Sequence, residues 1–196
     1  MSTVRTLTLA DAAWPRAGFL SNALLVAGAT LLTAFAAQVT VPVPWSPVPI
    51  TGQTFAVLLA GALLGARRGS LAQALYLAAG ATGLPVFAAG GSGPHTFVGP
   101  TGGYLLAFPL AAALTGALAE RGWDRRFGTM MVAMLLASGV IFALGLAVLA
   151  RFVPEGRLLA AGLIPFIPGD VVKAALAALA FPAVWRRVGL VGSRDA

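Results

Sequence analysis

Residues 165–174 read P F I P G D V V K A and place two opposite charges at the start of an otherwise apolar run. Asp170 and Lys173 are three residues apart, so on a helix their side chains occupy neighbouring positions of one face. Pro168 and Gly169, just before them, favour a helix that begins at Asp170. Lys173 is the only lysine among 13 basic residues. A single lysine in a chain that otherwise uses arginine indicates a position that needs a compact ammonium group rather than a planar guanidinium.

The composition of the whole chain is that of an integral membrane protein. Of the 196 residues, 59% are hydrophobic and 10% are charged, whereas soluble domains carry about 25% charged residues. The chain has no cysteine and one histidine, so we expect no disulfide, no metal site and no other cofactor. The net charge of +7 comes from arginine clusters between apolar runs. We interpret these clusters as topology signals and expect no binding of nucleic acid.

The apolar runs predict an all-α membrane protein with six transmembrane helices in one domain, 18–188, between an N-terminal tail (1–17) and a C-terminal tail (189–196). The first run, 19–37, is long enough to cross a hydrocarbon core of roughly 30 Å. A cleaved signal peptide is the alternative, because A F A at 34–36 resembles a cleavage site, but the apolar core exceeds that of a signal peptide. The other five predicted spans are 54–66, 71–84, 104–118, 130–149 and 170–184.

The arginines between the spans predict how the protein is oriented. Six spans place both termini on one side, and ten arginines share that side, whereas Arg151 and Arg157 lie on the other. Because basic residues accumulate on the cytoplasmic side, both termini are predicted to be cytoplasmic. We expect a multi-pass protein of a bacterial inner membrane. The ten arginines are Arg5, Arg16, Arg67, Arg68, Arg121, Arg125, Arg126, Arg186, Arg187 and Arg194.

This orientation places the loops after the first, third and fifth spans on the extracellular side, and two of them have an unusual composition. Residues 41–53 contain four prolines, and residues 81–103 are rich in glycine. Proline prevents a regular helix in the first loop, and glycine allows the second to approach a ligand closely. We therefore expect ordered loops that converge on Asp170 and Lys173.

The charged pair has a structural and a functional interpretation. Asp170 could cap the helix and pair with Lys173 without any ligand. However, an ionisable residue in a span costs ~2.5–3.5 kcal/mol on insertion scales and indicates function by default. The two loops, with aromatic residues nearby, favour a pocket for a mainly apolar solute with a few polar groups. Such a site captures a solute, so the chain is predicted not to be an enzyme.

Two sequence motifs bear on an enzymatic function. Residues 90–93 read G G S G, which matches the GxSG motif of intramembrane serine proteases. The only available base, His95, lies in the same loop rather than on a separate rigid element, so a flexible loop is the simpler interpretation. The chain contains no GxxxxGK[ST] motif, which excludes ATP hydrolysis through a P-loop.

Small residues recur at four-residue spacing in the first span. One series is Ala23 and Ala27, and the other is Ala29, Thr33 and Ala37. Such spacing allows helices to approach closely within a membrane. In this alanine-rich chain the series indicate either internal packing, coincidence, or a docking face for another membrane subunit.

Three separate stretches resemble one family. They are 48–87, V P I T G Q T F A V L L A G A L L G A R R G S L A Q A L Y L A A G A T G L P V F; 99–104, G P T G G Y; and 168–173, P G D V V K. Together they resemble the BioY family, the biotin-specific substrate-capture (S) components of energy-coupling factor (ECF) transporters. The resemblance covers nearly all of the chain after the N-terminal tail.

The resemblance implies a six-helix transporter that captures biotin with high affinity from outside and delivers it to the cytoplasm. It also implies partners: a module of one transmembrane coupling protein and two ATPases, docked through alanine-spaced positions of the first helix, best matched by Ala23 and Ala27. Self-association is the alternative for a solitary member. Uptake of a different vitamin-like solute, or a membrane assembly protein whose loops bind a partner, remain alternative functions.

The resemblance further implies a binding site for biotin. Biotin offers a carboxylate on a flexible chain and a ureido group with two N–H donors and one carbonyl, so a lysine and an acceptor fit its ends. The implied site residues are Pro49, Thr51, Gln53, Tyr76, Phe87, Gly99, Pro100, Thr101, Tyr104, Asp170 and Lys173.

Overall fold

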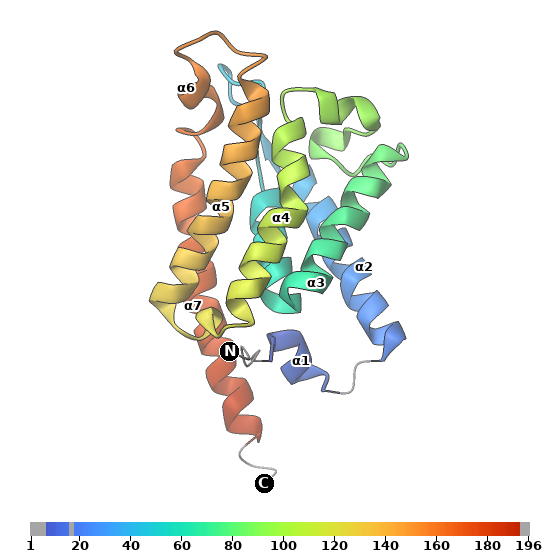
Figure 1. Cartoon of the computed structure of the whole chain (residues 1–196), viewed down its shortest axis with the longest axis vertical. Coiled ribbons are helices and arrows are strands. Elements are labelled where there is room, and N and C mark those ends of the chain that lie inside the picture. The colour runs from blue at the N-terminus through green and yellow to red at the C-terminus, as the bar shows by residue number, and fades with distance from the viewer. Residues whose placement is uncertain (1–6, 16–17, 193–196) are drawn as a thin grey trace, which may run out of the picture.

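The computed structural model describes residues 7–15 and 18–192, and it is a bundle of helices (Figure 1). Five helices are long and apolar enough to cross a membrane, judged by length and composition. The prediction of a mainly helical protein with membrane-spanning helices is therefore confirmed. These helices are α2 (Phe19–Gln38), α3 (Gln53–Ala81), α4 (Gly102–Ala119), α5 (Phe127–Leu149) and α7 (Ile167–Gly192).

Helix α3 reverses its direction at Gly65, where the backbone is not helical (φ +85°, ψ +173°). The side-chain amide of Gln53 donates to the hydroxyl of Tyr76 at 2.5 Å. In a straight helix, 23 residues would separate the two by ~35 Å, so the hydrogen bond requires a hairpin. The two arms of α3 correspond to the predicted spans 54–66 and 71–84, except that Arg67 and Arg68 already belong to the second arm.

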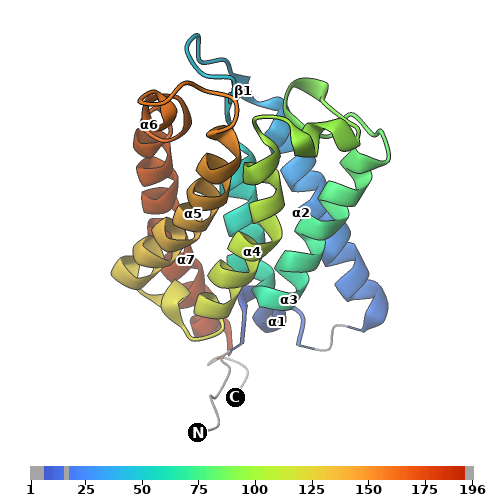
Figure 2. The same ribbon diagram turned by 45° about the horizontal axis from the view of Figure 1, so that its top comes forward.

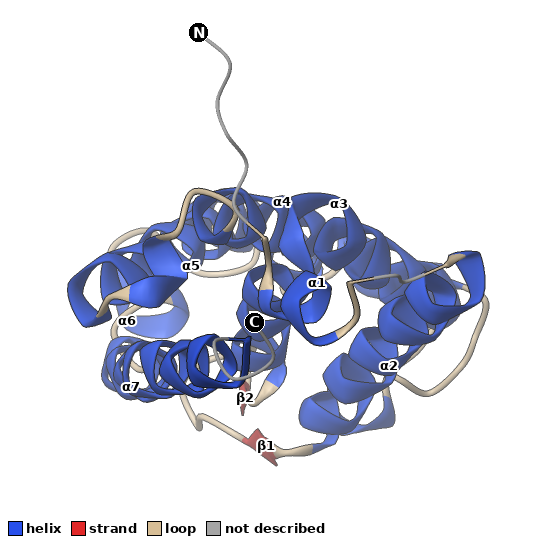
Figure 3. Ribbon diagram, turned by 90° about the horizontal axis from the view of Figure 1, so that it is seen from below, coloured by secondary structure: helices blue, strands red, loops and turns tan. Residues whose placement is uncertain are grey.

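Small residues allow the helices to pack closely around this hairpin. A Cβ on Gly69 would lie 2.7 Å from the Cα of Gly61 in the other arm, and Gly116 of α4 lies against the backbone of Gly65 and Ala66. Helix α4 packs on α3, α5 packs on α4, and α7 packs on α5, whereas α2 packs mainly on α3. Seen from below, α2 and α7 therefore flank the bundle (Figure 3).

All three long loops lie at one end of the bundle, the loop end (Figure 2). The first contains β1 (Thr40–Val41) and β2 (Ile50–Thr51), which pair antiparallel. The second contains the 3₁₀ turns η1 (Ala88–Gly90) and η2 (Pro94–Val98), and the third contains α6 (Leu158–Gly162). Their predicted extracellular position stays a prediction.

The opposite end, the arginine end, carries the Gly65 reversal, the short helix α1 (Leu9–Ala13) and η3 (Trp123–Arg125). Arg151 and Arg157 lie between α5 and α6, in the third long loop of the loop end. The charge asymmetry expected from the sequence is thus present along the bundle, although Arg5, Arg16 and Arg194 lie outside the described residues. Arg125 of η3 stacks on Trp185, which brings the last part of α7 to this end. The described basic residues at the arginine end are Arg67 and Arg68 after the Gly65 reversal, Arg121, Arg125 and Arg126 between α4 and α5, and Arg186 and Arg187 after Trp185.

Part of the predicted N-terminal tail folds against the bundle. Leu9 and Ala10 of α1 are buried, and α1 contacts α3 and α7. Arg68 holds α1 in place, because its guanidinium pairs with Asp11 at 2.5 Å and also donates to Asn22 at 3.0 Å. Helix α1, which lies inside the predicted tail 1–17, therefore packs on the bundle.

The last helix begins earlier than predicted. Helix α7 starts at Ile167 rather than at Asp170, and the N–H of Asp170 donates to the carbonyl of Phe166 at 2.9 Å. Pro168 is tolerated in the first turn because its missing N–H would have no helical acceptor there. The helix continues to Gly192, beyond the predicted boundary at 188, and residues 193–196 lie outside the described residues.

Candidate functional site

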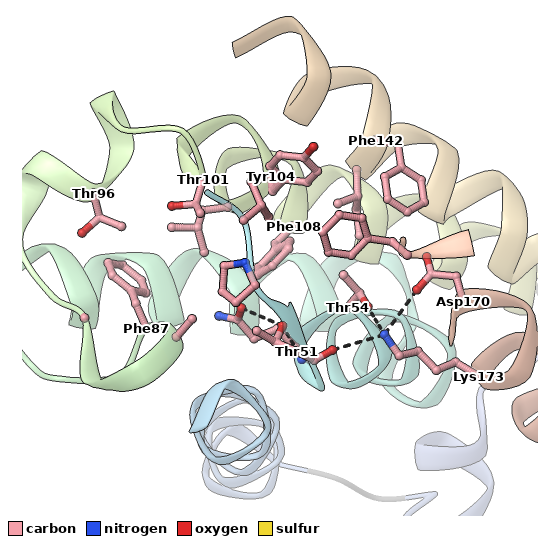
Figure 4. Close-up of a pocket in the computed structure, with 18 residues that line it drawn as sticks. Thr51, Thr54, Phe87, Thr96, Thr101, Tyr104, Phe108, Phe142, Asp170 and Lys173 are labelled. Carbon is pink, nitrogen blue, oxygen red and sulfur yellow. Dashed lines mark hydrogen bonds and ion pairs between the residues drawn. The ribbon is translucent and has the colours of Figure 1, made fainter. Parts of the chain in front are cut away.

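A cavity of about 170 Å³ lies near the loop end of the bundle. It is bounded by the loop between α2 and α3 (the proline loop), the start of α3, the loop between α3 and α4 (the glycine loop), α4, α5 and the start of α7. Segments far apart in the sequence therefore form one site (Figure 4). Its lining residues are Val48, Pro49, Thr51, Gln53, Thr54, Phe87, Ala88, Gly91, Thr96, Thr101, Tyr104, Leu105, Phe108, Ile141, Phe142, Phe166, Asp170 and Lys173.

The ammonium group of Lys173 is fully engaged by the protein. It donates to the hydroxyl of Thr54 at 2.8 Å, to the carbonyl of Thr51 at 3.2 Å and to Oδ1 of Asp170 at 3.2 Å. An ammonium group has three protons to donate, and here each has an acceptor. Lys173 therefore ties the end of the proline loop to α3 and α7 before any ligand is considered.

The carboxylate of Asp170 is only half used. Oδ1 accepts from Lys173, but Oδ2 is buried and has no hydrogen-bond partner among the described residues. The residue is only 6% exposed, and a buried charged oxygen without a partner is costly. Since Asp170 lines the cavity, the site offers one strong acceptor to a ligand that can donate a hydrogen bond.

Aromatic rings form much of the wall between the charged pair and the glycine loop. The rings of Tyr104 and Phe142 each lie near that of Phe166, with centroids 6.5 and 6.2 Å apart. Phe108 and Phe87 continue the wall (Figure 4). Such a surface favours a mainly apolar solute, and the few polar groups at its ends orient that solute.

A chain of hydrogen bonds behind the wall connects the two unusual loops. The Thr51 hydroxyl donates to Gln53, whose amide donates to the Tyr76 hydroxyl. Tyr76 in turn donates to the carbonyl of Val86 in the glycine loop at 3.0 Å. Gln53 and Tyr76 are buried, so this chain holds both loops against α3.

Most of the residues named from the sequence lie around the cavity. Tyr76 does not line it, because its ring is completely buried behind Phe87 and Phe108. Gly99 and Pro100 precede α4 and are not part of the lining. The predicted residues that line the cavity are Pro49, Thr51, Gln53, Phe87, Thr101, Tyr104, Asp170 and Lys173.

Several lining residues were missed in the sequence. Thr54 lies inside a stretch that carries the family resemblance, directly after Gln53, which was named, and its hydroxyl could have indicated it. Phe142 and Phe166 come from apolar runs that have no local signal of function. The other missed residues are Val48, Ala88, Gly91, Thr96, Leu105, Phe108 and Ile141.

The two series of small residues in α2 have different surroundings. Thr33 and Ala37 are buried, and Thr33 accepts a hydrogen bond from the amide of Gln73 at 3.2 Å. This series packs inside the bundle. Ala23 is exposed and Ala27 is half-buried, so the other series remains accessible to a partner.

Comparisons with known proteins agree with this architecture. The model of the BioY family matches residues 6–190. The biotin transporter BioY of Thermotoga maritima is 41% identical over 140 residues, covering 71% of this chain and 82% of the relative. The biotin transporter BioY of Rhizobium etli is 40% identical over 141 residues, covering 68% of this chain and 75% of the relative.

A solved structure has the same fold. It is a crystal structure of the S-component for biotin from an ECF-type ABC transporter, which superimposes with a TM-score of 0.74 at 27% identity and covers 85% of this chain and 92% of that chain. The family model spans nearly the whole sequence, and relatives at about 40% identity align over most of their length. The chain therefore belongs to the BioY family.

Proposed function

We propose that this chain is a biotin transporter that binds biotin with high affinity in the cavity near the loop end and delivers it to the cytoplasm. It is a membrane protein and not an enzyme. The family supports the solute, since its named members are biotin transporters. One observation supports the site: Asp170 lines a mostly apolar cavity that a small solute can fill, and its buried Oδ2 has no partner among the described residues.

The orientation of biotin follows from which polar atoms are still free. Lys173 and Asp170 form an ion pair, so both lie next to the same end of the bound ligand. A carboxylate placed there would meet the free carboxylate oxygen of Asp170 and would find no unused proton on Lys173. The ureido N–H groups instead satisfy Asp170 Oδ2. The valerate carboxylate then points toward Thr96 and Thr101, at the other end of the cavity (Figure 4).

The proposed arrangement in the membrane has the loop end outside the cell. The two arms of α3 cross the membrane separately, so the chain has six transmembrane helices with the arginine end in the cytoplasm. Biotin then enters from the extracellular face, where the loops lie. The hairpin in α3 and the arginine asymmetry support this arrangement.

The energy for delivery comes from other subunits. The chain has no P-loop, and its structural neighbour is an S-component of an ECF-type transporter. We expect the partners to be a transmembrane coupling protein and two ATPases, docked on the accessible face of α2 at Ala23 and Ala27. Self-association is the arrangement expected if this member works without such a module.

Calorimetric titration of the detergent-purified protein with biotin tests the proposed site. Saturable binding is expected, and biotin should also raise the unfolding temperature, because a ligand of the folded state stabilises it. Absence of saturable binding would refute the proposal. A competition panel of other vitamins against labelled biotin decides whether a different solute is preferred.

A further inference from the structure

The segment 86–91 of the glycine loop forms one wall of the cavity. Phe87, Ala88 and Gly91 line the cavity directly, and the Phe87 ring is buried. On the inner side, the Tyr76 hydroxyl donates to the carbonyl of Val86. The outer side of this segment faces the end of α2, where it meets a residue that sequence reasoning did not single out.

That residue is Gln38, the last residue of α2. Its side-chain Nε2 donates to the carbonyl of Phe87 at 3.3 Å, and its Oε1 accepts from the N–H of Gly90 at 3.2 Å. The same Nε2 also donates to Ala34 within α2 at 3.0 Å, which fixes the orientation of the amide. A single side chain thus adds a contact to a donor and to an acceptor of the same short turn, which is also closed by the hydrogen bond from the N–H of Gly90 to the carbonyl of Phe87 at 3.1 Å.

The turn that Gln38 holds is strained. Ala89 has φ +54° and ψ +35°, and it is the one non-glycine residue with a positive φ in the described part of the chain. The left-handed region is unfavourable for alanine because its Cβ approaches the following carbonyl oxygen. Strained turns persist only when their surroundings hold them. The two contacts from Gln38 are external restraints of this kind.

We propose that Gln38 is a positioning residue for biotin transport: from the end of α2 it holds the segment 86–91 closed against the cavity, and so controls how long biotin stays bound. The inference rests on the biotin site proposed above. Gln38 is itself exposed and does not line the cavity, so it acts through Phe87 rather than by touching the ligand. Loss of its contacts releases the outer side of the segment, whereas Tyr76 still holds the inner side.

The test is the rate at which labelled biotin leaves the purified full-length protein. In Gln38→Ala we expect dissociation to be faster by about three- to tenfold, the range expected for one or two net hydrogen bonds, with an association rate within about twofold of wild type. Gln38→Glu keeps the acceptor for the N–H of Gly90, so its dissociation rate should lie between those of wild type and Gln38→Ala. The matched control is Phe35→Ala, three residues earlier on α2, where the ring is 72% exposed.

A second variant separates positioning from a general effect on folding. Ala89→Gly removes the cost of the left-handed backbone, so in the Gln38→Ala background it should slow dissociation again. Unchanged dissociation in Gln38→Ala, or equal acceleration in Phe35→Ala, would overturn the inference. Hydrogen exchange without ligand gives an independent answer, since Gly90 and Gly91 should exchange faster in Gln38→Ala. If wild type fails to bind biotin, the proposed site fails, and the exchange measurement alone decides the role of Gln38.

Discussion

The two ends of the bundle each contain an ion pair, and the pairs differ in what they leave free. At the arginine end, Oδ1 of Asp11 pairs with Arg68, and its Oδ2 accepts from the hydroxyl and N–H of Thr8. At the loop end, Lys173 is fully engaged but Oδ2 of Asp170 has no partner among the described residues. A satisfied pair holds two elements together, whereas a half-satisfied pair beside a cavity is suited to receive a ligand.

The surroundings of the two pairs strengthen this difference. The Asp11 and Arg68 side chains are 35% and 20% exposed, and Asp170 is only 7% exposed at its side chain. Exposed pairs contribute little to stability, with a median near 0–1 kcal/mol. Removal of one partner from a buried pair is much more costly, about 3–5 kcal/mol. The four substitutions below should therefore separate the two ends.

The largest effect is expected from Lys173→Ala. This change leaves the carboxylate of Asp170 buried without its partner, so the free energy of unfolding should fall by about 3 kcal/mol or more. Biotin affinity should also fall at least tenfold, because Lys173 no longer holds Asp170, Thr51 and Thr54 in place at the cavity. Denaturation monitored in detergent and calorimetric titration measure the two quantities. Wild-type stability together with wild-type affinity would show that the ion pair contributes neither to folding nor to biotin binding.

Asp170→Asn should affect binding more than folding. The asparagine is neutral and nearly the same size, so no charge is left buried, but the charge-assisted acceptor for the ligand is lost. A contribution of ~1.5–3 kcal/mol for such a hydrogen bond corresponds to roughly tenfold to a hundredfold in affinity. The equivalent change at the other end, Asp11→Asn, is the control and should leave the biotin dissociation constant within about twofold of wild type.

Arg68→Ala should affect folding rather than binding. It removes the guanidinium that connects α1 with Asn22 at the start of α2. Because the pair is partly exposed, the expected loss of stability is only about 1 kcal/mol. The affinity for biotin should not change, and protease cleavage before residue 18 should become faster. A loss of biotin binding in a folded Arg68→Ala variant would contradict the division of roles between the two ends.

The smallest effect is a dependence on pH at the arginine end. Burial alone would raise the pKa of the Asp11 carboxyl, but the hydrogen bonds from Thr8 and Arg68, with the charge of Arg68, outweigh it and lower the pKa below 3.8. A carboxyl whose pKa is lowered by folding stabilises the fold above its unfolded pKa, and this contribution is lost as the pH falls below about 3.8. The unfolding temperature of Asp11→Asn should therefore fall less over this range than that of wild type.

The membrane class, the apolar spans and the charge asymmetry were predictable from the sequence, because each depends on local composition. Asp170 and Lys173 were found in the same way, since charges are rare in this chain and costly inside a membrane. The predicted start of the last helix was wrong by three residues. Proline is compatible with the first turn of a helix as well as with the position just before a helix, so Pro168 did not fix the start.

Only the tertiary structure decided which residues meet. Tyr76 was expected in the site but lies behind its wall, whereas Phe142 and Phe166, two apolar residues among many, face the cavity. Gln38 reaches the turn at Gly90 across 52 positions of sequence, and Asp170 has one free oxygen because Lys173 is already engaged by Thr51 and Thr54. The sequence by itself determined which charges needed partners. The packing of α2, the α3 hairpin and α7 decided which partner each one found, because that depends on distances between segments that no local pattern encodes.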